Sequence, residues 1–155
     1  MIKRGDLLVV KSKSLAGRVI RWFTKSWANH VAVVYDQASV IEADPKSGVN
    51  FSYLKKYNDT TRYEVRIFRF KDSEAIEQFM EALLTKLGRK YDWLHIASIV
   101  LRKVFNLRMD SKNMSICSEV VYEAAKESGI PVPNIQKVDF TPASVLAWDQ
   151  LKEVR

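Results

Sequence analysis

Cys117 is the residue with the clearest chemical potential, and it is the only cysteine among the 155 residues of the chain. It lies within residues 114–122, where the apolar pattern predicts the start of a helix. Backbone N–H groups at a helix N-terminus favour negative charge, and so they favour the reactive thiolate of a cysteine. A lone cysteine is also commonly a small buried apolar residue, so its position alone leaves a structural role open.

Two other residues could complete a catalytic group with Cys117. His30 begins a strand-like segment over residues 31–34, and Glu42 interrupts the apolar strand predicted at residues 40–43. A hairpin between these two strands would pair His30 with a residue near positions 43–45, which keeps His30 and Glu42 neighbours. The carboxylate would then orient the imidazole, and the imidazole would serve the thiol as base and acid. The alternative for Glu42 is a strand residue that faces solvent.

Metal and cofactor sites find no support in the sequence. The second histidine, His95, falls in an apolar helical segment beside Asp92 and is interpreted as a structural or surface residue. Two histidines and one cysteine far apart in sequence match no known metal-ligand spacing. A glycine-rich phosphate loop is also missing, so we expect neither a metal nor an organic cofactor.

Length and composition predict one globular domain over residues 1–155. The apolar fraction is 47%, and a single cysteine rules out an internal disulfide. The N-terminal residues lack the apolar core and cleavage site of a signal peptide, and no stretch has the length of a spanning helix. We therefore expect a cytoplasmic protein as the sequence stands, with delivery to the cell envelope by another route left open.

The formal net charge of +7 favours acidic partners without choosing among them. Residues 14–27 form a basic amphipathic pattern that carries tryptophan; such a helix either packs on the domain or lies on an anionic membrane surface. Nucleic acid is the less favoured partner, because the sequence holds no recognised nucleic-acid motif. It would depend on the basic residues Arg62, Arg66, Arg69, Lys103, Arg108 and Lys112, for which a solvated basic surface is the simpler interpretation.

The order of predicted elements indicates an α+β fold. Strands are expected at residues 7–10, 29–35, 40–43, 49–51 and 63–70. Helices are expected after them, at residues 75–87, 91–105, 117–126 and in a short segment after Thr141, in addition to the early helix at 14–27. Ser115 is a candidate N-cap for the cysteine helix. Antiparallel strands therefore come first, helices pack on them, and the nucleophile helix lies near the C-terminus.

Several short motifs in this order resemble a known group of enzymes. The sheet motifs are Gly5-Asp6-Leu7-Leu8-Val9, His30-Val31-Ala32-Val33-Val34-Tyr35 and Val40-Ile41-Glu42-Ala43, and the later ones are Gly88-Arg89-Lys90-Tyr91-Asp92-Trp93, Ile116-Cys117-Ser118-Glu119-Val120-Val121 and Thr141-Pro142-Ala143-Ser144. Together they resemble the papain-like cysteine hydrolases of the NlpC superfamily. Because the cysteine helix comes last, the chain is similar to the circularly permuted, YiiX-like group.

The resemblance implies a permuted papain-like fold and a triad of Cys117, His30 and Glu42. It also implies a role for Tyr91 in substrate contact or oxyanion support, whereas Asp92 would only shape its turn. Members of the group are thought to cleave amide or ester bonds in peptidoglycan-type peptides or in acylated, lipid-like molecules. We expect no export signal, in contrast to many relatives, which weakens the assignment to cleavage of cell-wall peptides unless the protein is delivered by another route. A non-catalytic lipid- or peptide-binding module with the same fold is the alternative function.

Overall fold

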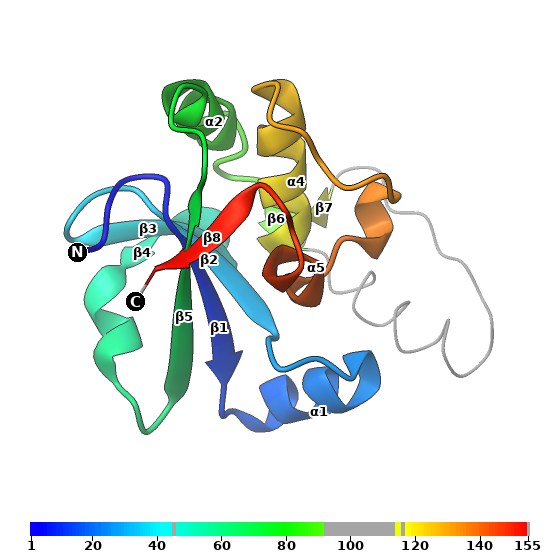
Figure 1. Ribbon diagram of the computed structural model, residues 1–155. Helices are drawn as coiled ribbons and strands as arrows, with labels where there is room; N and C mark the ends of the chain where they lie inside the picture. The colour runs from blue at the N-terminus through cyan, green and yellow to red at the C-terminus, as the bar shows by residue number, and fades with distance from the viewer. Residues whose placement is uncertain (45, 92–113, 116, 155) are drawn as a thin grey trace.

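A six-stranded antiparallel sheet forms the centre of the computed structural model, which describes residues 1–44, 46–91, 114–115 and 117–154 (Figure 1). The strand order is β4-β3-β2-β1-β5-β8, so the hairpin strands lie at one end and the last strand at the other. The strands are β1 (Leu7–Ser12), β2 (His30–Val34), β3 (Ser39–Asp44), β4 (Gly48–Tyr53), β5 (Tyr63–Phe70) and β8 (Leu151–Val154). The predicted α+β architecture, with the sheet first and the nucleophile helix late, is confirmed.

The helices lie largely where the sequence predicts them. They are α1 (Leu15–Thr24), α2 (Ile76–Leu84), α4 (Cys117–Glu127) and α5 (Pro142–Leu146), with 3₁₀ turns η1 (Leu54–Asn58) and η2 (Lys137–Asp139). Ser14 caps α1 by accepting a hydrogen bond from the Gly17 N–H, and Thr141 and Ser144 form a capping box on α5. The prediction of a helix start at Tyr91 is wrong, because Tyr91 belongs to the short strand β6 (Lys90–Tyr91). The remainder of that predicted helix and the loop after it lie outside the described residues.

A parallel two-stranded ladder precedes the cysteine helix. β6 pairs with β7 (Met114–Ser115), with Tyr91 opposite Ser115. Ser115 is therefore a strand residue, and the prediction that it caps the helix is wrong because α4 begins two residues later, at Cys117. The ladder places the segment after α2 directly beside the start of α4.

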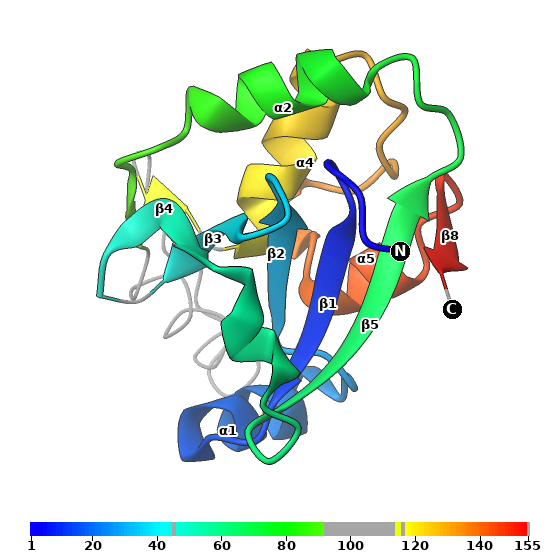
Figure 2. The same ribbon diagram turned by 90° about the vertical axis from the view of Figure 1, so that its left-hand side faces the viewer.

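Both faces of the central strands are covered, which explains their continuous apolar sequences. On one face, Leu7, Val9, Val31 and Val33 belong to a core cluster that also contains the buried residues of α2 and α4. On the other face, Leu8, Val10, Ala32 and Val34 pack with Tyr57 of η1. Helices α2 and α4 lie beside each other on one side of the sheet, and η1 lies on the opposite side (Figures 1 and 2).

Strand β8 is another element that sequence analysis did not predict. It is short, and of its four residues only Leu151 is buried. It pairs with β5, where Arg66 donates from Nε and Nη2 to the two carboxylate oxygens of Glu153 at 2.8 and 2.5 Å. Arg69 makes a similar two-point contact with the buried Asp6. Two of the arginines of the predicted basic face are therefore engaged in ion pairs within the fold.

Gly48 links the sheet edge to the ladder that leads to Cys117. Its φ of +72° lies in the left-handed region, and a Cβ at this position would overlap the Arg89 carbonyl oxygen. The same stretch is held by two hydrogen bonds of 2.9 and 2.8 Å, from Gly88 N–H to the Val49 carbonyl and from Val49 N–H to the Arg89 carbonyl.

Within the described residues, no helix is both long and apolar enough to cross a membrane.

Replacing Gly48 by alanine should destabilise the fold more than the same change at Gly129. Both glycines have positive φ, but a Cβ at Gly129 would meet nothing within 4 Å. Gly129→Ala should therefore cost only the conformational strain, about 1–2 kcal/mol, and Gly48→Ala should cost about 1–3 kcal/mol more because the backbone must move. Urea unfolding followed by circular dichroism measures both. Equal losses in the two variants would contradict the close approach at Gly48.

Candidate active site

His30 and Glu42 are adjacent, as the hairpin register predicts. Strands β2 and β3 pair Ala32 with Glu42 and Val34 with Val40. His30 Nε2 lies 2.7 Å from Glu42 Oε2, and the Glu42 side chain is only 3% exposed. The alternative of a solvent-facing strand residue is thus wrong for Glu42. A buried carboxylate bonded to an imidazole nitrogen can fix both the orientation and the tautomer of that ring.

Cys117 is the first residue of α4, and it is largely buried in the core cluster between the helix and the sheet. The same helix is anchored by Ser118, whose Oγ donates to the Phe140 carbonyl at 2.7 Å. The thiol lies close enough to His30 to raise the pKa of its imidazole. Because Nε2 of that ring is bonded to Glu42, we infer that Nδ1 is the nitrogen that faces the sulfur.

The three side chains approach one another at the end of the sheet. Glu42 shares its face with Ala32 and the residues that pack on η1, whereas Cys117 belongs to the cluster on the α4 side. His30 is the first residue of β2, where the strand begins. A side chain in this position can contact the carboxylate on one side of the sheet and the thiol on the other.

The surroundings of His30 favour its protonated form. Burial alone would lower the pKa of His30, but Cys117 and the Glu42 carboxylate outweigh burial and raise the pKa to about 10. The imidazole is therefore a cation at neutral pH, which is the form that stabilises a neighbouring thiolate and can later donate a proton.

Glu42 is held in its ionised form by its neighbours. Burial would raise the pKa of this carboxyl, but hydrogen bonds and charge from His30, Lys56 and Tyr57 hold it well below its usual range. Lys56 Nζ donates to Oε1, and Tyr57 Oη donates to Oε2 at 2.5 Å. Sequence analysis missed Lys56 and Tyr57. The only available signal was an aromatic residue inside a polar segment, because the turn that carries them back to Glu42 is set by tertiary packing.

The remaining predicted residues are Tyr91, Asp92 and His95, and of these only the backbone of Tyr91 is described. The backbone of Tyr91 lies in β6, one strand away from β7 and the start of α4, and its side chain is not described. Its predicted role in substrate contact therefore stays a prediction. His95 and Asp92 lie outside the described residues.

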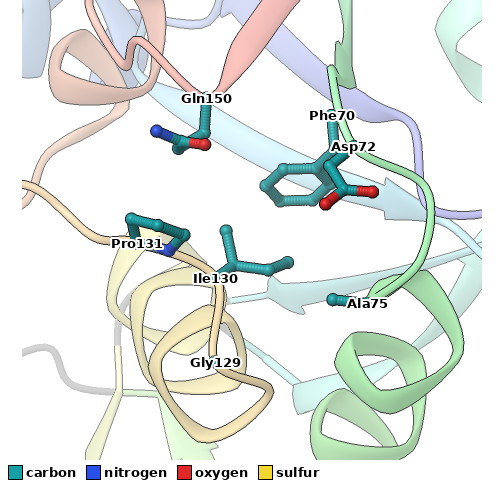
Figure 3. A pocket seen from close by; sticks show the side chains of 7 residues that line it. All are labelled: Phe70, Asp72, Ala75, Gly129, Ile130, Pro131 and Gln150. Atoms are coloured by element: carbon teal, nitrogen blue, oxygen red, sulfur yellow. The ribbon is translucent and has the colours of Figure 1, made fainter.

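A pocket of about 170 Å³ lies elsewhere in the molecule (Figure 3). Its lining includes Gly129, Ile130 and Pro131, which follow the C-terminal end of α4, together with Phe70 and Gln150 from the β5 and β8 region. Cys117 is at the other end of this helix, about 15 Å away at 1.5 Å per residue. The pocket is therefore separate from the candidate active site.

Possible metal ligands do not cluster within the described residues. Among them, no three His, Cys, Asp or Glu side chains gather so that they could hold a metal ion. The His30 and Glu42 pair does not suit this purpose either, because Lys56 and Tyr57 already donate to both oxygens of the carboxylate.

With its cysteine helix late in the chain, the fold is that of a papain-like cysteine hydrolase in permuted order. A family model described as "Permuted papain-like amidase enzyme, YaeF/YiiX, C92 family" matches residues 1–154. The chain belongs to this family, and it is a cysteine hydrolase. A search of curated proteins found no match.

A solved structure shows the same fold. It is described as the crystal structure of the metalloprotein yiiX from Escherichia coli O157:H7, and it aligns with a TM-score of 0.60 at 18% identity. The alignment covers 99% of this chain and 96% of that one. At this identity, the likeness shows the fold alone.

Glu42→Gln should make stability less dependent on acidic pH. The folded pKa of Glu42 lies below its ordinary value of 4.5, so as pH falls below 4.5 the unfolded chain binds a proton before the folded chain does. The stabilising contribution of the carboxylate is complete above pH 4.5 and is lost as pH falls through the folded pKa. The wild-type advantage over Glu42→Gln, about 3 kcal/mol at neutral pH, should therefore shrink in acid.

Urea unfolding at neutral and acidic pH measures this difference. Glu74→Gln is the matched control at an exposed position, and it should stay within about 0.5 kcal/mol of wild type at neutral pH. A wild-type advantage over Glu42→Gln that is unchanged in acid would contradict the ionised, paired carboxylate.

Proposed function

We propose that this chain hydrolyses an amide or ester bond through a triad of Cys117, His30 and Glu42. The observation that carries the proposal is the position of His30, which has Glu42 on one ring nitrogen and Cys117 as its other partner. The supporting finding is membership in a family of permuted papain-like amidases.

The proposed reaction is acyl transfer to Cys117. The thiolate attacks the substrate carbonyl carbon, and backbone N–H groups in the first turn of α4 stabilise the oxyanion. His30 donates its proton to the leaving amine or alcohol as the carbon–heteroatom bond breaks, which leaves a thioester. Neutral His30 then removes a proton from water, the resulting hydroxide attacks the thioester, and Cys117 leaves as thiolate beside the restored imidazolium. Glu42 orients the ring and stabilises its cationic form throughout.

The acyl group would come from a peptidoglycan-type peptide or from an acylated, lipid-like molecule. Both present a carbonyl that a cysteine nucleophile can attack, and fold alone does not choose between them. Aminomethylcoumarin amides carrying either a short peptide or a medium-chain fatty acyl group distinguish the two classes with one fluorescent readout.

Cys117→Ala should abolish release of aminomethylcoumarin while the circular dichroism spectrum stays unchanged. His30→Ala should lower kcat/KM by about 10²–10⁴-fold, which is the usual contribution of a general acid and base. Glu42→Gln should be impaired but still measurable, and Glu64→Gln, at a carboxylate outside the site that pairs with Lys11, is the matched control with unchanged kcat/KM. Full activity in Cys117→Ala or His30→Ala would overturn the proposal.

Helix α1 favours an anionic membrane surface as a partner. Leu15 and Trp22 are 77% and 75% exposed, and they follow one stripe of the helix together with the exposed Arg18 and Lys25. Apolar side chains beside cations match the acyl and phosphate layers of an anionic bilayer. We infer that this stripe carries the enzyme to a lipid surface, where an acylated substrate would be found.

Vesicle co-sedimentation at low salt tests this partner. Wild type should bind vesicles that contain anionic phosphatidylglycerol and should bind pure phosphatidylcholine vesicles weakly, because the basic residues contribute only on the anionic surface. The double variant Leu15→Ser/Trp22→Ser should lose most of the binding. Tyr53→Ser is the matched control, since Tyr53 is 71% exposed on a different element. Unchanged binding by the double variant, or no binding by wild type, would remove α1 as a membrane element.

A further inference from the structure

The Glu42 carboxylate is held by more than its histidine. Its two oxygens receive hydrogen bonds from three side chains: Lys56 Nζ on Oε1, and Tyr57 Oη at 2.5 Å and His30 Nε2 at 2.7 Å on Oε2. Lys56 and Tyr57 both come from η1, which follows the sheet edge strand β4. We propose that Lys56 and Tyr57 are positioning residues. They fix the orientation of the Glu42 carboxylate and limit how strongly this carboxylate stabilises the protonated form of His30. This inference rests on the proposed function of the triad.

Orientation is the first part of the argument. A carboxylate offers about four lone-pair directions on two oxygens, and a single bond to His30 would leave it free to rotate about its last torsion. Lys56 occupies one oxygen while Tyr57 and His30 share the other, so rotation would break all three hydrogen bonds. The Tyr57 ring is itself held by an edge-on contact with Tyr63, with ring centroids 5.3 Å apart.

Tyr57 can act only as a donor toward this carboxylate. Burial and the adjacent Glu42 charge raise the pKa of Tyr57 above its ordinary value of 10, so the phenol keeps its proton at neutral pH. An ionised carboxylate accepts hydrogen bonds and donates none. The short hydrogen bond between them therefore stabilises the charged form of Glu42 in one position.

Charge is the second part of the argument. Lys56 and protonated His30 are both cations bonded to the single negative charge of Glu42. The Lys56 side chain is 32% exposed and that of His30 is 19% exposed, so their mutual repulsion is weakened by solvent but not abolished. Lys56 therefore makes the imidazolium less stable than Glu42 alone would make it, and a less stable imidazolium is a better proton donor to the leaving group.

Among the described residues, the titratable groups around His30 are Cys117 on α4, Glu42 on β3, and Lys56 and Tyr57 on η1, with Tyr63 on β5 behind Tyr57. Removing the Lys56 charge should thus raise the pKa of His30. For two partly exposed cations that share one carboxylate, we expect a rise of about one unit. Lys56→Met keeps the aliphatic stem that packs near the Tyr57 ring, where Nζ lies 4.9 Å from the centroid. Lys56→Arg keeps the charge and is the matched control.

The decisive experiment is an NMR titration of ¹⁵N-labelled histidine in a Cys117→Ala background. The removal of Cys117 takes away a group that raises the pKa of His30, and so brings the titration into a convenient range. Adding Lys56→Met should raise the pKa of His30 by about one unit, whereas Lys56→Arg should shift it little. Tyr57→Phe should raise it by a smaller amount, because Oε2 is left to His30 alone. An unchanged or lower pKa of His30 in the Lys56→Met variant would overturn the inference.

Kinetics of the same changes in the Cys117 enzyme separate this inference from the proposed function. With aminomethylcoumarin amides, Lys56→Met should shift the alkaline limb of the pH profile of kcat/KM to higher pH by about one unit. The same variant should lower kcat with little change in KM. Lys56→Arg should keep the wild-type pH profile and the wild-type kcat. If no amide is hydrolysed but the NMR shifts appear, the proposed function fails and the positioning role stands. If hydrolysis depends on Cys117 but neither the limb nor the titration moves, the positioning role fails alone.

Discussion

The buried Glu42 carboxylate imposes the physical constraint on which the candidate site depends. A charge with a side chain only 3% exposed must be paired and hydrogen-bonded, because an unpaired buried ion costs several kcal/mol. Its partners come from two different elements, His30 from β2 and the Lys56–Tyr57 pair from η1. The carboxylate therefore links β2, which begins with His30, to η1, which covers one face of the sheet. A movement of η1 would change the hydrogen bonds of Glu42 and so the position of the His30 imidazole.

The thiol reaches this charge network from the other side of the sheet. The central strands are apolar on both faces, so α4 can pack on one face while η1 packs on the other. The Ser118 hydrogen bond to Phe140 and the ion pair of Lys86 with Glu127 hold α4 near its two ends. Fixing the helix in this way fixes Cys117, its first residue, against the end of β2.

Sequence analysis predicted the features that depend on the periodicity of apolar residues and on contacts between residues close in sequence. The hairpin of β2 and β3 has a short polar turn and a period of two, so the neighbour relation of His30 and Glu42 followed from the register. Lys56 and Tyr57 could not be predicted, because their contact depends on where a 3₁₀ turn returns across the sheet. Strand β8 was missed because it has one buried residue and forms through pairing with β5. Ser115 has the residue type of a helix cap, but its pairing with Tyr91 makes it a strand residue.

The central claim of the proposed function is that the His30 imidazolium stabilises a reactive thiolate at Cys117. The most direct measurement is the pH dependence of Cys117 carbamidomethylation by iodoacetamide, followed by intact-mass spectrometry in wild type and His30→Gln. Iodoacetamide is small enough for a thiol whose residue is 6% exposed, and the single cysteine makes the mass shift unambiguous. The account predicts fast alkylation of wild type at neutral pH, and alkylation of His30→Gln that is at least about tenfold slower. Superimposable profiles for the two proteins would contradict it.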